Sequence, residues 1–425
     1  MGMVNKLKII KRRFKSSIYR GTGEAVLIMM NHPELDVSRD ILNGARHYVG
    51  YDPQCEGGRE EYFIRLIDLS PRKDEIVRKI LQILSKATDK HWDYGMSQLN
   101  DIASTLAKRG NERARRILYQ LAGKNLGSET ALIEADGIDA LKFIAGVKGK
   151  LLLQKSRKLK DDWTIEDDFL IKTAKEAYPA LNPKKELEKE AIHNRDVKRF
   201  LSHITRAKRQ TIQKKTPQPT YKSISEMIAR SEKVRRHVGR RLSKRDLALI
   251  ARDMLNERDL SKIQQYLWIF TVVPFPLGCK PLVKYVRIKN AKIRWFSIQA
   301  LALFKDASVR KLAIKQIKAG NNTSEYLNLL AMNYRESDNK LILDTFKSMR
   351  NKEAFHRAGH AIRDIFDANS TKRCVDALVE IYNRSSCSLC RRHAVRIMAK
   401  NGVLSETIKN EINYDSYIKP EDLNG

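Results

Sequence analysis

The residues in this chain that are best suited to metal binding or redox chemistry are cysteines close to a histidine. Cys387 and Cys390 form a CxxC pair, His393 follows three residues later, and Cys374 lies upstream. Zinc in proteins takes four convergent ligands. On a helix, however, His393 lies about 120° around the axis from Cys387, and the chain has no second CxxC. A thiol at a helix N-terminus could also do redox chemistry, so three interpretations remain: a metal site, a redox pair, and buried apolar cysteines.

A basic stretch from 233 to 245 is the strongest candidate for binding a ligand. As a continuous helix it would place Val234, Val238 and Leu242 on one face, and Arg236, Arg240 and Lys244 on another, about 6 Å apart. Such a row suits the phosphates of a nucleic-acid backbone. The alternative is a solvated face without a ligand. The candidate residues of this stretch are Lys233, Arg235, Arg236, Arg240, Arg241, Lys244 and Arg245.

A second basic cluster precedes it and contains no acidic residue between its first and last member. It consists of Arg206, Lys208, Arg209, Lys214 and Lys215. Few aromatic residues are interleaved, with Tyr221 the nearest, so stacking on unpaired bases has little support. The whole chain carries a net charge of +32. So large an excess repels itself unless counterions or a polyanion neutralise it, which makes nucleic acid, anionic lipid headgroups or an acidic protein candidate partners, with nucleic acid or an acidic protein expected first. The alternative is a chain that is rich in lysine without such a partner.

Helical signals run through most of the sequence that must position these residues. Glycine and proline are scarce, with 20 and 11 residues, and no stretch alternates strictly enough to predict a strand. Ser243 begins a capping pattern with Asp246, and apolar residues then recur at helical spacing. The sequence therefore predicts an all-α fold.

An internal repeat appears in the C-terminal half of the chain. The segments 309–317 and 390–398 share one pattern: an apolar residue is followed directly by Arg, Ala stands three positions after the Arg, and a large apolar residue stands four positions after the Ala. The segment 293–301 fits the same pattern with Ser in place of Ala. Small Ala313 and Ala394 would let helices approach closely. Arg310 and Arg391 are expected to bind neighbouring helix ends or carboxylates. The same alignment puts Cys390 in an apolar position, which favours a buried cysteine and no metal or cofactor.

The segments 292–304, 308–320 and 389–402 resemble HEAT-like repeats of the phycobilin-lyase-related type found in bacterial scaffold proteins. The resemblance extends from about 244 to about 412 and is weaker over the first 150 residues. It implies an α-solenoid of stacked antiparallel helix pairs, in which neighbours bury each other's apolar faces. It implies no activity, since such repeats serve many partners.

One enzyme class shares that architecture. A family of alkylpurine DNA glycosylases resembles stacked HEAT-like helices with a basic concave face and uses Trp, Asp and Arg there. Trp163 and Asp167 have a similar spacing, but acidic neighbours around them would repel DNA. No metalloprotease motif, phosphate loop or nucleophile elbow occurs. We therefore expect a binding or scaffold protein without catalysis, either for nucleic acid or for an acidic partner protein.

Composition sets the expected organisation and location. We predict a helical repeat segment at 1–150, a charged insertion or linker at 151–222 containing Pro217 and Pro219, a HEAT-like solenoid at 223–415 and a tail at 416–425. Five cysteines without dense spacing fit a reducing cytoplasm. No apolar run is long enough to cross a membrane. The sequence does not indicate an oligomeric state.

Overall fold

The computed structural model describes residues 3–48, 50–88, 93–124, 126–154, 164–210 and 218–423. Over these residues the fold is all-α, with 24 α-helices, several short 3-10 helices and no strand. The predicted fold class is therefore confirmed. The chain divides into unit 1, which comprises 1–214 with 407–419, and unit 2, which comprises 215–406 with 420–425. None of the described helices combines the length and the apolar character that crossing a bilayer requires.

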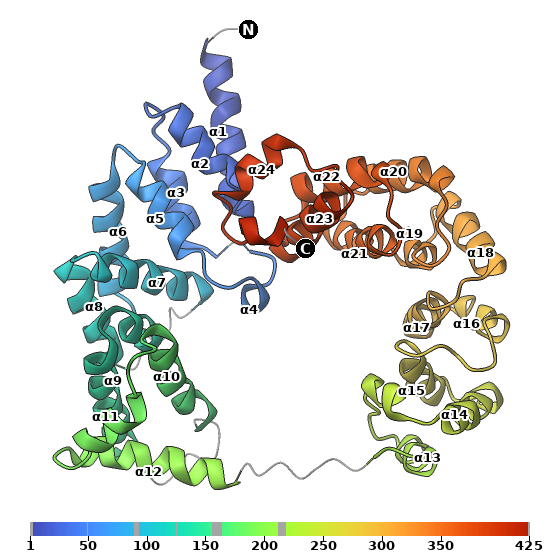
Figure 1. The fold of residues 1–425 in the computed structure, drawn as a ribbon, viewed down its shortest axis with the longest axis horizontal. Coiled ribbons are helices and arrows are strands. Elements are labelled where there is room, and N and C mark those ends of the chain that lie inside the picture. Colours follow the sequence, from blue (N-terminus) through green and yellow to red (C-terminus); the bar gives the residue numbers. More distant parts are fainter. Residues whose placement is uncertain are drawn as a thin grey trace. The chain divides into compact units, whose positions relative to one another are not determined.

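In unit 1 the helices pack mainly against others that are near them in sequence, as in an α-solenoid; α9, for example, packs against α8, α10 and α12 (Figure 1). The helix α9 is interrupted at Gly137, whose φ of 61° favours glycine and against which the Tyr178 ring packs. The helices are α1 (Met3–Arg20), α2 (Glu24–Asn31), α3 (Ser38–Arg46), α4 (Pro53–Glu56), α5 (Glu60–Asp68), α6 (Lys73–Ser85), α7 (Tyr94–Lys108), α8 (Glu112–Gly123), α9 (Glu129–Gln154), α10 (Thr164–Ala177), α11 (Pro183–Glu190) and α12 (Arg195–Gln210).

Unit 2 repeats this sequential packing from α13 to α23. Its α-helices are α13 (Tyr221–Ala229), α14 (Lys244–Asn256), α15 (Leu260–Phe270), α16 (Val283–Val286), α17 (Ala291–Leu301), α18 (Ala307–Lys318), α19 (Thr323–Tyr326), α20 (Asn339–Ser348), α21 (Lys352–Ala368), α22 (Val375–Arg384) and α23 (Ser388–Lys400). The 3-10 helices are η2 (Arg236–Arg241), η3 (Lys280–Leu282), η4 (Leu327–Leu330), η5 (Glu336–Asp338), η6 (Lys372–Cys374) and η7 (Pro420–Leu423).

The charged middle of the chain, predicted as an insertion or linker at 151–222, contributes packed helices to unit 1. Helices α10, α11 and α12 lie against α9. Their apolar residues Leu170, Leu187, Val197 and Phe200 are buried in the same core as those of the preceding helices. Charge dominates the composition here, yet one apolar face per helix is enough to bury a helix.

The end of the chain contributes to unit 1. The helix α24 (Glu406–Ile412) and the residues up to 419 belong almost entirely to this unit. The Ser416 amide donates to the Gly21 carbonyl at 2.8 Å, and the Glu411 carbonyl lies where a Cβ on Gly23 would stand. Ile412 is buried there. The glycines thus permit a close backbone contact.

The repeat predicted from sequence corresponds to helices α17, α18 and α23. The small residues in its Ala position, Ser297, Ala313 and Ala394, have no exposed surface. Its arginines all bind within the protein, as expected. Arg294 Nε lies 3.5 Å from a Glu325 carboxylate oxygen, Arg310 pairs with Asp338, and the fully buried Arg391 donates to the Ser385 carbonyl and the Ser388 hydroxyl. The arginine positions therefore stabilise helix packing.

Candidate functional site

The basic stretch 233–245, here called the basic segment, lies in unit 2 between α13 and α14 and packs against α15. Val234, Gly239 and Leu242 are buried. The Val234 amide donates to the Gln265 side chain at 3.2 Å, and Gly239 leaves no room for a Cβ beside the Ile269 carbonyl. Apolar residues therefore fix this segment to unit 2.

The prediction of one continuous helix over 233–245 is wrong. The chain turns at Ser231 with a φ of 58°, forms the short η2, and becomes extended again at Leu242 and Ser243. The Ser243 hydroxyl accepts from the Asp246 amide at 3.0 Å, which caps α14 and confirms the predicted capping pattern. Because an N-cap residue is not helical, a helix cannot run through Ser243, and the predicted row of cations at helical spacing does not exist.

All seven cations of the basic segment are nevertheless exposed. Arg241 is held by Gln218, which donates to the Arg241 carbonyl at 2.7 Å. Within the described part of the chain, the other six have no carboxylate partner within ion-pair distance: Lys233, Arg235, Arg236, Arg240, Lys244 and Arg245. A segment anchored by its apolar residues thus presents unneutralised positive charge to solvent.

Aromatic rings lie beside these cations, which the sequence did not predict. The Arg236 guanidinium carbon is 5.6 Å from the centroid of the Trp268 ring. Trp268 in turn lies 6.2 Å from Trp295 and 4.8 Å from Phe296, centroid to centroid. Both tryptophans are only partly buried. Their helices leave part of each indole at the surface.

The second basic cluster is described only in part. Arg206, Lys208 and Arg209 belong to the last turns of α12, and their side chains lie outside the described residues, as do Lys214 and Lys215 entirely. The predicted role of this cluster stays a prediction. The glycosylase-like pair has the same status, because Trp163 and the Asp167 side chain lie outside the described residues.

A compact group of metal-binding side chain types forms between α21 and α23. Nε2 of His356 and Nε2 of His360 are 3.3 Å apart, and the Cys390 thiol is 3.7 Å from Nε2 of His360. The ligand atoms of these three residues all lie within 4.8 Å of one another. The Cys387 side chain hydrogen bonds with both Cys390 and His356. Three potential ligands thus meet at one place, and Cys387 is hydrogen-bonded to two of them.

The electrostatics of this group favour deprotonated ligands. The hydrogen bonds from the Cys390 thiol and the His356 ring, with one from the Cys390 backbone amide, hold the pKa of Cys387 well below its ordinary value although burial raises it. Burial and the positive charge of Arg363 lower the pKa of His360. Neutral imidazole and thiolate are the forms that bind metals.

The other residues considered from sequence lie elsewhere. His393 Nδ1 is 2.9 Å from Arg363 Nη1, and His393 is not one of the three residues whose ligand atoms lie within 4.8 Å of one another. Cys374 is fully buried, and burial raises its pKa to about 11. The sequence analysis missed His356 and His360. Their spacing of four residues places both on one helix face and was the available signal.

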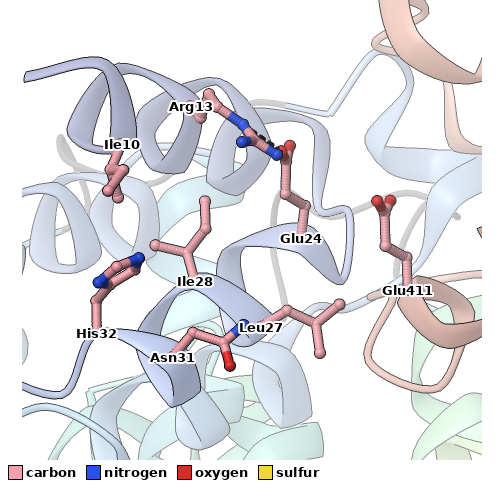
Figure 2. Close-up of a pocket in the computed structure, with 8 residues that line it drawn as sticks. All are labelled: Ile10, Arg13, Glu24, Leu27, Ile28, Asn31, His32 and Glu411. Carbon is pink, nitrogen blue, oxygen red and sulfur yellow. Dashed lines mark hydrogen bonds and ion pairs between the residues drawn. The ribbon is translucent and has the colours of Figure 1, made fainter. Parts of the chain in front are cut away.

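Unit 1 contains a cavity of about 240 Å³, shown in Figure 2. Arg13 on its wall donates to Glu24 at 2.8 Å, and Glu24 also accepts from Ser17. The carboxylate is thus engaged by groups of the protein itself. The remaining wall consists of the apolar Ile10, Leu27 and Ile28 and the polar Asn31, His32 and Glu411 (Figure 2).

Comparison with known proteins adds little to this description. No protein-family model and no curated protein matches this chain. Among solved structures, it is similar to the crystal structure of an engineered protein from the Northeast Structural Genomics Consortium, with 13% sequence identity. That alignment covers 82% of this chain and 97% of the other, with a TM-score of 0.30. A score this low carries no argument about fold or function.

Proposed function

We propose that this protein binds the phosphate backbone of nucleic acid through the basic segment of a HEAT-like solenoid. The observation that carries the proposal is the set of six exposed cations without a described carboxylate partner on an anchored segment. Phosphates bound there would replace counterions, and the released counterions supply the binding free energy. Fixed backbone positions limit the entropy that such binding costs.

The proposal favours a polyanion over a small anion because exposed cations occur along the whole segment from Lys233 to Arg245. Arg235, Arg236 and Arg240 offer planar guanidinium groups that can bind phosphate oxygens in pairs. The partly exposed Trp268 and Trp295 add aromatic surface next to Arg236. Unpaired bases stack on such rings, so single strands are the preferred substrate class to test first.

The HEAT-like identity of unit 2 rests on the repeat. Its buried small residues and internally bound arginines occur in α17, α18 and α23 at matching positions. Repeats of this kind expose extended surfaces on which many weak contacts add up. Such surfaces are compatible with a binding role, and the absence of catalysis is part of the proposal.

The test is fluorescence anisotropy with a labelled single strand and a labelled duplex, measured over a series of salt concentrations. The variant Lys233→Gln/Arg240→Gln/Lys244→Gln removes three cations from the basic segment. If each contacts a phosphate, the log–log salt slope on single strands should fall by about 2 in magnitude. The control Lys311→Gln/Lys315→Gln/Lys318→Gln removes the same charge from exposed positions on α18.

The control variant should retain the slope and most of the affinity. Equal losses in both variants would show that binding follows net charge and not the basic segment. No salt-dependent binding of either nucleic acid by the full chain would reject the proposal. It would leave an acidic partner protein as the explanation for the charge.

A further inference from the structure

The group between α21 and α23 has the composition of a structural zinc site. His356 and His360 come from consecutive turns of α21, Cys387 caps the start of α23, and Cys390 lies in the first turn of that helix. All four belong to unit 2. Cys387 and Cys390 are 4% exposed each, and the histidines are partly buried. The site is therefore shielded from bulk water.

Two of the distances between the ligand atoms are close to those of a tetrahedron around zinc. Zn–N bonds of about 2.05 Å and Zn–S bonds of about 2.3 Å at tetrahedral angles require N···N of about 3.35 Å and S···N of about 3.55 Å. The structure has 3.3 Å between the two Nε2 atoms and 3.7 Å between Cys390 Sγ and His360 Nε2. His356, His360 and Cys390 thus already have a spacing close to the one that a shared ion imposes, and the hydrogen bonds of Cys387 with Cys390 and His356 place a fourth ligand beside them.

Hydrogen bonds and packing of neighbouring residues also hold the ligand side chains in place. The Ser385 hydroxyl accepts from the Cys387 amide at 3.2 Å, and the Ser385 carbonyl and Ser388 hydroxyl accept from the buried Arg391. These bonds fix the turn from which Cys387 projects. On α21 the neighbouring Phe355 and Gly359 are buried against other helices, which fixes the orientation of the helix face that carries the histidines. Support of this kind around the ligands is characteristic of metal sites.

We infer that His356, His360, Cys387 and Cys390 form a Cys2His2 zinc site that links α21 to α23. Thiolate and imidazole ligands select zinc over magnesium or calcium, which prefer oxygen. Four protein ligands leave no open position, so the site is structural. The site is independent of the proposed nucleic-acid binding, because it uses different residues and a different measurement tests it.

Two alternatives use the same side chains without a metal. The histidines could share one N–H···N hydrogen bond, with the cysteines as buried thiols. Cys387 and Cys390 could also form a disulfide under oxidising conditions, although they are not disulfide-bonded in the structure. Neither alternative predicts stoichiometric metal binding by the reduced protein.

The first experiment measures metal in the full chain, purified without chelator under reducing conditions, by inductively coupled plasma mass spectrometry. We expect about one zinc per chain, as a closed four-ligand site retains its ion. The second experiment titrates the chelator-treated protein with Co²⁺ alone. A tetrahedral site with two thiolates gives a thiolate-to-cobalt charge-transfer band and intense visible ligand-field bands, both of which zinc then abolishes.

Variants locate the ion. His360→Asn and Cys387→Ser should lose the zinc and the cobalt spectrum. Two controls should keep both: Cys374→Ser, which changes a buried cysteine of the same unit, and His393→Asn, which changes the neighbouring histidine that contacts Arg363.

Should a ligand variant fail to fold, the metal content and cobalt spectrum of the unmodified chain still decide the matter. The inference is overturned if the reduced protein binds neither zinc nor cobalt stoichiometrically, if the cobalt spectrum lacks the thiolate band, or if the ligand variants keep the metal.

Discussion

Replacing Asp101 by Asn should stabilise unit 1 at neutral and alkaline pH. Asp101 lies on α7 and is partly buried. Burial, with the negative charges of Glu60 and Glu134, raises the pKa of its carboxyl from 3.8 to about 7, while Lys108 opposes the shift. The charged form is therefore disfavoured in the folded protein, and Asn removes the charge while keeping the shape.

The size and sign of this change in stability follow from the linkage between folding and proton binding. Between the unfolded pKa near 4 and the folded pKa near 7, the folded state holds a proton that the unfolded state has lost, so stability falls as pH rises through this window. The full shift corresponds to roughly 4 kcal/mol above pH 7. Because Asp101 keeps some contact with solvent and its surroundings can relax, we expect Asp101→Asn to gain about 2 kcal/mol at pH 8. At pH 4 both proteins should be equally stable.

The assay is urea unfolding of the full chain followed by circular dichroism at pH 4 and pH 8. If the two units unfold separately, the transition that responds belongs to unit 1. Asp139→Asn, an exposed change on α9, is the control and should shift stability by no more than about 0.5 kcal/mol. A gain that is the same at both pH values, or a loss at pH 8, would refute the electrostatic reasoning.

Two further predictions concern the repeat in unit 2. Arg310→Gln leaves the buried Asp338 carboxylate without its cation and should destabilise unit 2 by about 2 kcal/mol in urea unfolding, whereas Lys311→Gln on the exposed side of α18 should be neutral. Ala394→Leu inserts bulk where no surface is exposed and should lower stability by about 2 kcal/mol; Arg396→Leu on the exposed face of α23 should not. Neutral results for Arg310→Gln or Ala394→Leu would show that these positions do not hold the repeats together.

The sequence was sufficient for the fold class and for the repeat, because both depend on local periodicity. The apolar spacing that placed Ala313 and Ala394 in contact positions is a property of each helix alone, and both residues are fully buried. The sequence was insufficient to predict the conformation of the basic segment. Helical spacing of Val234, Val238 and Leu242 suggested a helix, but Ser243 caps α14 and the segment before it bonds to α15. A cap and a tertiary contact overrode periodicity.

The candidate metal ligands show a different limit. The sequence contained both halves, the histidines spaced by four on α21 and the CxxC at the start of α23. Considered separately, each half has too few ligands for a metal site. From the sequence, the CxxC was considered together with His393, but His393 contacts Arg363 instead. The two halves come within ligand distance only because α21 packs against α23 with α22 between them in sequence. Convergence across 27 or more residues of chain depends on tertiary packing.

This position also explains what a metal would add to a repeat architecture. In a stack of helix pairs each helix contacts only near neighbours, so stability depends on every interface separately. An ion held by two residues of α21 and two at the start of α23 would act at one such interface, where the fully buried Arg391 already organises the turn before α23. A metal bound only by the folded state stabilises it through binding. Unit 2 would then gain cooperativity at this interface without a larger apolar core.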